Sequence, residues 1–477
     1  MDAVELADIL AWTGGSLVAG PERSVAAGVV TDSRAVSRGD CFVALVGERF
    51  DGHHFVGEAV GRGAAVVVYA PARFDPASLD RAGLANEASF VAVEDTKKAF
   101  QGIGRGYRLR FSIPVVGITG SNGKTTTKEM TKAVLAGLGE VVATEKNFNN
   151  EIGLPMTLLR IEGRHKAAVV EMGMRAAGEI AELASIALPT AGIVTNVGPV
   201  HVEFFGSVDE VAREKGALIR SLPEGGVAIL NGDDPRVRAM AQETCARVVT
   251  YGIEGPADVR AEEIETRGLA GVEFTLAWPG GKRRVRLGLP GRHHVYNAAA
   301  AAAAGYALGV DVDFAARALE SVRPASMRTE VVRLGSGIVL IDDAYNSSPL
   351  SSKAALEVLG DVEGKRKVAV LGDMRELGAY AGEAHRELGR RAARAGVEAL
   401  IAVGEHARVV ARAAKEENVG LDAVVCADAG EAAAAARCVV RPGDVVLVKG
   451  SRGVRLEIVT EALKSAFGVD GGEEAER

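Results

Sequence analysis

Short apolar runs alternate with longer amphipathic segments along most of the chain. Runs rich in Val, Ile and Leu with few polar residues are typical of strands buried on both faces of a sheet. Their alternation with helical segments predicts an α/β fold with mostly parallel sheets. Strands are expected at residues 25–30, 41–46, 64–69, 115–118, 141–143, 167–170, 193–195, 227–230, 248–251, 338–341, 367–371, 400–403 and 445–448.

The pattern divides into three units, which agrees with a length of 477 residues at about 100–200 residues per domain. We predict domains at 1–98, 99–323 and 324–477, the last beginning at Pro324-Ala325-Ser326. The first is a small α/β unit, the second a parallel sheet and the third a doubly wound, Rossmann-like sheet. Helices are predicted at 55–62, 124–138, 208–222 and 298–304, and the tail from Gly468 is predicted to be disordered.

Composition narrows the class of protein. Hydrophobic residues make up 48% and charged residues 25%, as in ordinary globular domains. The net charge is −7 without a basic block, which argues against general nucleic-acid binding. No apolar run approaches the length of about 18 residues that a membrane span needs, and no signal peptide is evident. Four scattered cysteines indicate free thiols in a reducing cytoplasm.

The stretch 115–127 carries the strongest chemical signal. An apolar strand, a glycine-rich turn, Lys124-Thr125 and a helix follow one another, which is the order of a phosphate-binding loop. Lys124 can reach the β- and γ-phosphates and the Thr125 hydroxyl can hold Mg²⁺. The first glycine, Gly117, lies one residue earlier than the usual spacing. The alternative is that these glycines serve only the turn.

Other polar residues also follow predicted strands. Glu171 is either an acidic partner of Mg²⁺ or a helix-start carboxylate, and His201 is a lone histidine of the kind that is usually structural. The clusters 31–34 and 47–55 either bind a ligand or serve turns and helix caps. In the third unit, the clusters 342–346, 372–374 and 449–452 follow three strands and predict one ligand-facing edge.

Lys215 falls on the apolar face of the helix predicted at 208–222. A buried, unpaired ammonium there would be costly. The residues alone leave open that the aliphatic stem lies on the core while the charged head reaches water.

Several motifs together resemble the Mur ligases of bacterial cell-wall synthesis, over nearly the whole chain. They are Gly-Ile-Thr-Gly-Ser-Asn-Gly-Lys-Thr-Thr from Gly117, Asn-Phe-Asn-Asn-Glu-Ile-Gly-Leu-Pro from Asn147, Glu-Met-Gly-Met from Glu171, Asp-Asp-Ala-Tyr-Asn-Ser-Ser-Pro from Asp342, Leu-Gly-Asp-Met-Arg-Glu-Leu-Gly from Leu371 and Val-Lys-Gly-Ser-Arg-Gly from Val448. The resemblance implies a uridine-nucleotide domain, a central ATPase domain and a C-terminal domain that holds the dipeptide and part of the ATP lid.

The implied reaction is an ADP-forming ligation in peptidoglycan synthesis. It joins the peptide carboxylate of UDP-N-acetylmuramoyl-tripeptide to the amine of D-alanyl-D-alanine through an acyl phosphate, with ATP and two Mg²⁺ as expected cofactors. A monomer is expected, without nucleic acid or membrane as a partner. The sequence leaves open whether the third peptide residue is lysine or diaminopimelate.

The resemblance also implies roles for individual residues. Lys124, Glu171, His201 and Lys215 would be catalytic, with Thr125, Glu171, His201 and a carbamylated Lys215 around Mg²⁺. ATP contacts are expected from Thr119, Gly120, Ser121, Asn122, Gly123, Lys124, Thr125, Thr126, Asn297, Arg328 and Asp343. Substrate contacts are expected from Ser33, Arg34, Asp51, His53, Asn149, Asn150, Tyr345, Asn346 and Lys449.

Two departures from the family pattern are visible. His294 stands where an Asn is usual, and Ser347-Ser348 replaces Ala-Asn. A nucleotide switch or motor and a folylpolyglutamate synthetase are the alternatives. The two flanking α/β domains disfavour the first, and the uridine-type cluster with Asp32-Ser33-Arg34 disfavours the second.

Overall fold

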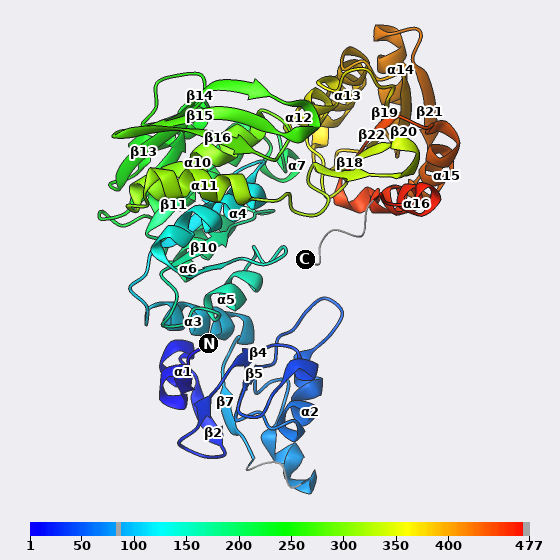
Figure 1. The fold of residues 1–477 in the computed structure, drawn as a ribbon. Coiled ribbons are helices and arrows are strands. Elements are labelled where there is room, and N and C mark those ends of the chain that lie inside the picture. The colour runs from blue at the N-terminus through cyan, green and yellow to red at the C-terminus, as the bar shows by residue number, and fades with distance from the viewer. Residues whose placement is uncertain (83–86, 471–477) are drawn as a thin grey trace.

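The computed structural model describes residues 1–82 and 87–470, and in this part of the chain three α/β domains each carry their own sheet (Figure 1). The predicted fold class is confirmed. The prediction of a disordered tail from Gly468 is wrong at its start, because Val469 pairs with Leu334 and the Asp470 N–H donates to the Arg333 carbonyl. Residues 471–477 lie outside the described part.

The N-terminal domain is a five-stranded sheet with a short separate ribbon. The predicted strand at 25–30 is split, because its first half pairs in the ribbon and its second half joins the sheet. The sheet order is β2 (Ser16–Ala19), β7 (Ser89–Ala92), β6 (Val66–Tyr69), β5 (Cys41–Val43) and β4 (Val29–Val30), and β1 (Val4–Glu5) pairs with β3 (Val25–Ala26). Helices α1 (Leu6–Thr13) and α2 (Val56–Gly61) belong to this unit.

The central domain is built on nine strands. Seven neighbouring strands run parallel, and the last two extend the sheet as an antiparallel meander that the apolar pattern did not predict. The order is β16 (Gly281–Leu287), β15 (Val272–Trp278), β14 (Val259–Thr266), β13 (Arg247–Gly252), β12 (Val227–Asn231), β11 (Ala191–Val194), β8 (Val115–Thr119), β10 (Ala167–Glu171) and β9 (Val141–Ala143).

Helices cover both faces of the central sheet (Figure 1). They are α3 (Thr96–Arg108), α4 (Lys124–Leu135), α5 (Gly153–Leu158), α6 (Glu179–Ala187), α7 (Val202–Phe205), α8 (Val208–Arg220), α9 (Pro235–Ala239), α10 (His293–Ala307) and α11 (Val312–Ser321). The alanines 298–304 of α10 are all fully buried, in one cluster with Val116 and Ile118 of β8 and Met130 and Val134 of α4. Their small side chains let α10 lie close to both elements.

The C-terminal domain is a six-stranded sheet in which only β17 runs antiparallel. The order is β17 (Glu330–Arg333), β18 (Val339–Asp343), β22 (Val445–Lys449), β19 (Lys367–Gly372), β20 (Ala399–Val403) and β21 (Asp422–Cys426), with helices α12 (Pro349–Gly360), α13 (Ala381–Arg394), α14 (Ala407–Glu417), α15 (Ala429–Val439) and α16 (Glu457–Phe467). The ends of β18, β22 and β19 meet at one edge, as the strand-end clusters predicted.

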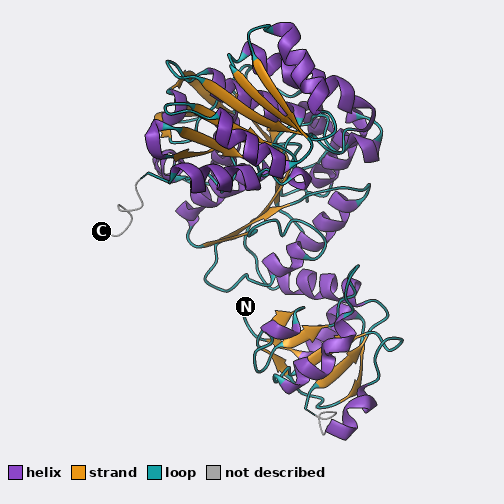
Figure 2. Cartoon of the chain, turned by 90° about the vertical axis from the view of Figure 1, so that its right-hand side faces the viewer, coloured by secondary structure: helices purple, strands orange, loops and turns teal. Residues whose placement is uncertain are grey.

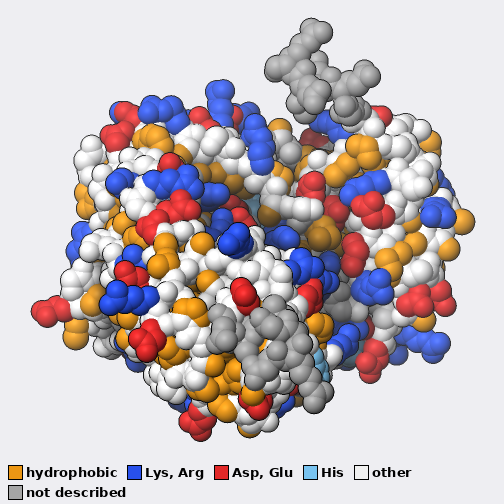
Figure 3. Space-filling view, turned by 90° about the horizontal axis from the view of Figure 1, so that it is seen from below, with side chains coloured by type: hydrophobic (Ala, Val, Ile, Leu, Met, Phe, Trp, Pro, Cys, Tyr) orange, Lys and Arg blue, Asp and Glu red, His pale blue; other side chains and the backbone are white. Residues whose placement is uncertain are grey.

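The N-terminal domain packs against the central domain at α3, and the C-terminal domain lies beside the central domain (Figures 1 and 2). Tyr107 of α3 ties the first junction, because its hydroxyl accepts from the Asp2 N–H and donates to the Ile161 carbonyl. Viewed from below, the surface has a furrow between two lobes, and Lys and Arg side chains lie beside this furrow (Figure 3). None of the helices within 1–82 and 87–470 is long and apolar enough to cross a bilayer.

Asp342, at the end of β18, gives a pH-dependent prediction. Burial raises its pKa from 3.8 to about 6, so ionisation at neutral pH costs the folded state up to about 3 kcal/mol. The folded state binds this proton more tightly than the unfolded chain, so stability falls as pH rises between the two values. We expect Asp342→Asn to be more stable than the parent at pH 7 and nearly equal to it at pH 4, measured by urea unfolding. A stability difference that is the same at both pH values would contradict this.

Candidate active site

The glycine loop between β8 and α4 forms an open helix N-terminus. Gly120 and Gly123 have φ of 148° and 81°, which disfavour other residues. A Cβ at Gly120 would lie 1.8 Å from the Thr195 Oγ1, and one at Gly123 would lie 2.5 Å from the Asn297 Oδ1. Since Gly123 is the N-cap of α4, no side chain occupies the first N–H groups of the helix, which suit a phosphate.

Three side chains converge beside this loop. The Thr125 hydroxyl donates to one Glu171 oxygen at 2.9 Å, and the Asn149 amide donates to the other at 2.9 Å. Glu171 is buried at the end of β10, beside β8. Hydroxyl and carboxylate oxygens are the hard ligands that Mg²⁺ prefers, so this donor set fits Mg²⁺. Thr125 and Glu171, which the resemblance places around Mg²⁺, are thus in direct contact.

Lys124 lies at the centre of the electrostatics. Its Nζ donates to the Gly120 carbonyl at 2.8 Å, within its own loop. Burial lowers the pKa of Lys124, the Glu171 carboxylate raises it, and the Arg328 guanidinium lowers it further. Arg328 belongs to the C-terminal domain, so that domain reaches the phosphate loop electrostatically. Two cationic side chains, Lys124 and Arg328, thus act near one carboxylate, Glu171, an arrangement that suits a polyphosphate.

Lys215 lies inside the protein on α8, so the alternative in which its head reaches water is wrong. The residue is 1% exposed, and within residues 1–82 and 87–470 its Nζ has one hydrogen-bonding partner, the Met174 Sδ at 3.7 Å. Burial lowers the pKa of Lys215 well below its ordinary value, and the nearby Lys124 lowers it further. This lysine is therefore biased toward the neutral amine.

His201 contacts the C-terminal domain directly. Its Nδ1 lies 2.5 Å from the Glu376 carboxylate, and the Glu203 N–H donates to the Glu376 carbonyl. His201 and Glu376 both adopt left-handed backbone conformations, with φ of 57° and 62°. Non-glycine residues persist in that region only where their surroundings hold them. The pair therefore marks a specific junction between the domains.

The C-terminal domain brings its own polar edge to the junction. Lys449 is buried, 2.5 Å from the Asp343 carboxylate, and donates to the Asn346 carbonyl. The Arg328 guanidinium stacks 4.1 Å from the centre of the Tyr345 ring. These five residues are the ones that the sequence predicted for this domain, and the structure gathers them at one edge.

Ser348 makes a direct bridge between the two domains. Its hydroxyl donates to the Asn122 Oδ1 in the phosphate loop at 2.8 Å and also caps α12. The departure from the family pattern at 347–348 therefore falls on an interdomain contact.

Asn297 lies behind the glycine loop. Its Oδ1 accepts from the Thr127 hydroxyl at 3.3 Å, and its Nδ2 lies 3.4 Å from the His294 Nδ1. His294, the other departure, therefore supports Asn297. His293 lies near the C-terminal domain. Burial lowers its pKa to about 4; the Asp343 carboxylate of that domain opposes this shift, and the Lys449 ammonium adds to it.

In the N-terminal domain the predicted residues differ in access. Ser33 is buried and donates to Glu58, whereas Arg34 is exposed and pairs with Asp32. His53 is buried, with its Nδ1 on Asp51 and its Nε2 accepting from the Ala70 N–H.

The 47–55 loop is thus braced from inside. Burial opposes the ionisation of Asp51, but hydrogen bonds from His53 and Arg73 outweigh it and lower its pKa to about 2. Because both ring nitrogens of His53 are engaged, that residue shapes the loop. Both carboxylate oxygens of Asp51 are therefore in use, by His53 and by Arg73, and Arg34 is exposed but paired with Asp32. The Asn150 side chain is similarly occupied, accepting from the Gly153 N–H at the start of α5.

Asp373, His385 and His406 also lie close together, within the C-terminal domain. The His385 Nε2 already accepts from the Met374 N–H, and Asp373 accepts from the Glu405 and His406 N–H groups. The two rings stack at 4.1 Å and 10°, so their lone pairs do not converge on one point. This cluster braces the start of α14.

Sequence reasoning did not single out Glu376, Asn196 or Thr144, and it marked Ser348 only as part of a departure from the family pattern. Asn196 accepts from the Asn122 N–H and so holds the phosphate loop. Glu376 and Ser348 lay inside motifs quoted for the resemblance, but their contacts cross between domains that the sequence does not orient. Thr144 follows a short strand and carries no charge, so no pattern marked it.

A phosphate loop in a central domain that has an α/β domain on either side is the arrangement of a nucleotide-dependent enzyme. Residues 118–305 match the Mur ligase middle domain, 327–452 the Mur ligase glutamate ligase domain and 26–108 the Mur ligase family catalytic domain. The chain belongs to the Mur ligase family.

Individual relatives are similar over nearly the full length. UDP-N-acetylmuramoyl-tripeptide–D-alanyl-D-alanine ligase of Mycobacterium tuberculosis (strain ATCC 25618 / H37Rv) is 40% identical over 472 residues, covering 92% of each chain. The crystal structure of MurF from Acinetobacter baumannii superposes with a TM-score of 0.88 at 31% identity, covering 98% of this chain and 99% of that one. MurF from Thermotoga maritima in complex with ADP gives 0.78 at 30% identity, covering 92% and 97%.

Lys124 provides a direct test of the phosphate loop. We expect Lys124→Ala to lower turnover by about 10²–10³, as when one preorganised donor to a developing charge is removed. ADP release measures the rate, and thermal unfolding checks that the fold is kept. Lys132→Ala, an exposed lysine on the same helix, is the matched control and should leave turnover unchanged. Near-normal turnover in folded Lys124→Ala would remove the assignment.

Proposed function

We propose that this chain joins D-alanyl-D-alanine to UDP-N-acetylmuramoyl-tripeptide, giving UDP-N-acetylmuramoyl-pentapeptide, ADP and phosphate. As a Mur ligase it is an ATP-dependent acid–amino acid ligase of peptidoglycan synthesis. The observation that carries the proposal is the contact of Thr125 with Glu171 at the open N-terminus of α4, beside a C-terminal domain that touches the same loop. A product of this kind serves cell-wall growth, and hence cell shape and division.

The proposed reaction has two steps. A carboxylate oxygen of the tripeptide attacks the γ-phosphorus of ATP, the bond to the β-phosphate oxygen breaks and ADP leaves. The dipeptide amine then attacks the acyl carbon, loses a proton, and phosphate leaves. Lys124 and the first N–H groups of α4 hold the phosphates, and Thr125 with Glu171 would hold Mg²⁺, which neutralises charge on the phosphates.

The three domains would bind different parts of the substrates. The exposed Arg34 and the 47–55 loop of the N-terminal domain would bind the uridine diphosphate, because an arginine can bind phosphate oxygens bidentately. Arg328, Tyr345 and Lys449 line the C-terminal edge for the dipeptide and ATP. Four unpaired cysteines agree with a reducing compartment, and we place the enzyme in the cytoplasm.

The direct test is ADP release with UDP-N-acetylmuramoyl-tripeptide, with and without D-alanyl-D-alanine. We expect sustained release only when both are present, since the amine must discharge the acyl phosphate. The lysine and diaminopimelate forms of the tripeptide should be compared in parallel. Release that needs neither substrate would support an ATPase, and release with folate and glutamate would support the folylpolyglutamate alternative.

We further propose that Lys215 is carbamylated and that this group, with Glu171 and His201, holds a second Mg²⁺. The support is chemical. A neutral lysine amine adds to CO₂ and releases one proton, and the environment of Lys215 favours the neutral form. The resulting carbamate is an anion, which would offset the charge of neighbouring Lys124.

Lys215→Ala tests this proposal. We expect it to be nearly inactive, to keep nucleotide binding, and to be partly restored by short carboxylates that occupy the space of the carbamate. Lys124→Ala serves as the control, because the same carboxylates should not restore it. High activity of Lys215→Ala, or a mass for the native protein under CO₂ that shows no carbamate, would refute carbamylation.

A further inference from the structure

We propose that Thr144, pinned by the buried Lys128, is a positioning residue for Glu171 and sets the affinity of the site for Mg²⁺. The proposal rests on the function above, in which Glu171 faces the metal. Neither residue touches nucleotide or metal in this assignment; both act through the carboxylate.

The strand pairing around Glu171 is irregular at one place. β9 pairs with β10 through Ala143 and Val169, and the Thr144 N–H continues the ladder by donating to the Val169 carbonyl. In a regular parallel ladder the next bond would run from the Glu171 N–H to the Thr144 carbonyl. Here the Glu171 N–H instead donates to the Thr144 hydroxyl, at 3.0 Å.

Lys128 hydrogen-bonds to the Thr144 carbonyl, which the Glu171 N–H would bond in a regular ladder. Its Nζ donates to the Thr144 carbonyl at 2.6 Å and pairs with Glu129 at 2.7 Å. The residue is 1% exposed, and burying an ammonium is costly unless its partners are fixed. Lys128 lies one helical turn after Lys124, so α4 carries both the phosphate-binding lysine and the lysine that pins Thr144.

The arrangement holds both protein ligands of the metal against one helix. Thr125 belongs to α4 itself, and Glu171 is tied back to α4 through Thr144 and Lys128. β9 is the edge strand of the sheet, so no further strand supports this side of Glu171.

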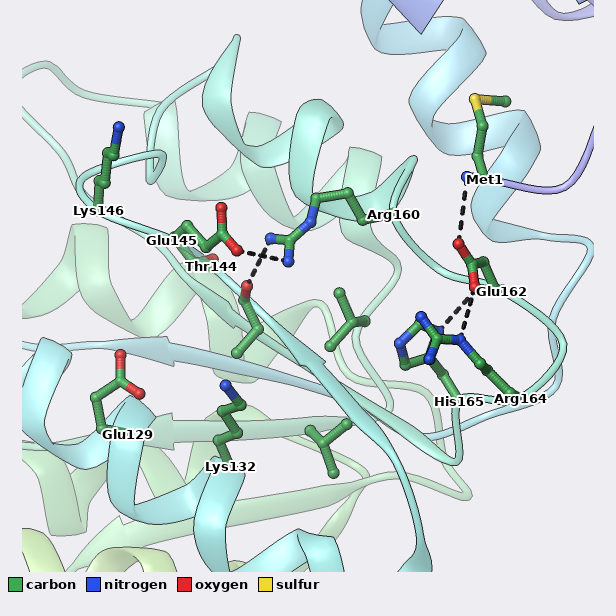
Figure 4. Close-up of a pocket in the computed structure, with 13 residues that line it drawn as sticks. Met1, Glu129, Lys132, Thr144, Glu145, Lys146, Arg160, Glu162, Arg164 and His165 are labelled. Atoms are coloured by element: carbon green, nitrogen blue, oxygen red, sulfur yellow. Dashed lines mark hydrogen bonds and ion pairs between the residues drawn. The ribbon is translucent and has the colours of Figure 1, made fainter. Parts of the chain in front are cut away.

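The outer side of this network opens into a cavity of about 420 Å³ at the sheet edge. Glu129, Lys132 and Thr144 line it (Figure 4). Solvent thus reaches the Glu129 end of the network, while Thr144 is only 2% exposed. Thr144 therefore lies between the cavity and Glu171, with its hydroxyl on the Glu171 backbone N–H.

The test is a matched pair of variants, Thr144→Val and Thr144→Ser. Valine keeps the shape and removes the acceptor for the Glu171 N–H, whereas serine keeps the hydroxyl. Calorimetric titration of ADP at a series of MgCl₂ concentrations gives nucleotide affinity with and without the metal. We expect Thr144→Val to need about 10–100-fold more Mg²⁺ for the same gain in ADP affinity, as for other groups that orient a metal ligand. Its Mg²⁺-free ADP affinity should be unchanged, and Thr144→Ser should stay close to the parent.

Lys128→Met gives a second route should Thr144→Val fold poorly, and thermal unfolding of every variant is the control. For Lys128→Met we also expect a higher Mg²⁺ requirement for the same gain in ADP affinity, with a smaller increase than for Thr144→Val. Parent-like Mg²⁺ dependence in either Thr144→Val or Lys128→Met would overturn the proposal, as would an equal loss of ADP affinity with and without Mg²⁺. Failure of the parent to ligate, or to bind ADP more tightly with Mg²⁺, would instead refute the proposed function.

Discussion

The structure depends on basic side chains gathered at the start of α4. Lys124 lies there under the influence of the Arg328 guanidinium and disfavours the charged form of Lys215, and Glu171 is the carboxylate that offsets Lys124. Such an arrangement is costly unless an anion completes it. The helix N-terminus adds to the same field. A bound polyphosphate is therefore part of the electrostatic balance of this protein, and the surrounding side chains keep the binding groups in place before it arrives.

Much of the architecture was predictable because the chemistry is local. Strands buried on both faces are visible in the sequence as apolar runs, and β9 was predicted with the bounds it has in the structure. The glycine loop was predictable for the same reason, since its backbone needs and its Lys-Thr pair are adjacent in sequence. The meander β14 to β16 was missed because its strands carry many charged residues that form ion pairs with one another, such as Lys282 of β16 with Glu262 of β14.

Contacts between domains were not predictable. His201 lies in the central domain and Glu376 in the C-terminal one, and no spacing in the sequence sets their separation. The same holds for Ser348 and Asn122. Lys215 was predictable only in part. Its place on the apolar face of the helix followed from the sequence, but the burial of its side chain depended on how α8 packs on the sheet. The domain limits, and the parts of Ser33, Arg34, Tyr345 and Asn346 in binding, remain predictions.

The run of buried alanines in α10 has a consequence for how this chain can change over evolution. Helix α10 lies so close to α4 that a methyl group added at Gly305 would meet a side-chain methyl of Val134 at 2.5 Å. A side chain at Gly305, at the end of this row, would have to displace Val134 and with it the helix that begins at Lys124. The choice of residue at Gly305 is thus limited by the placement of a site at the other end of α4.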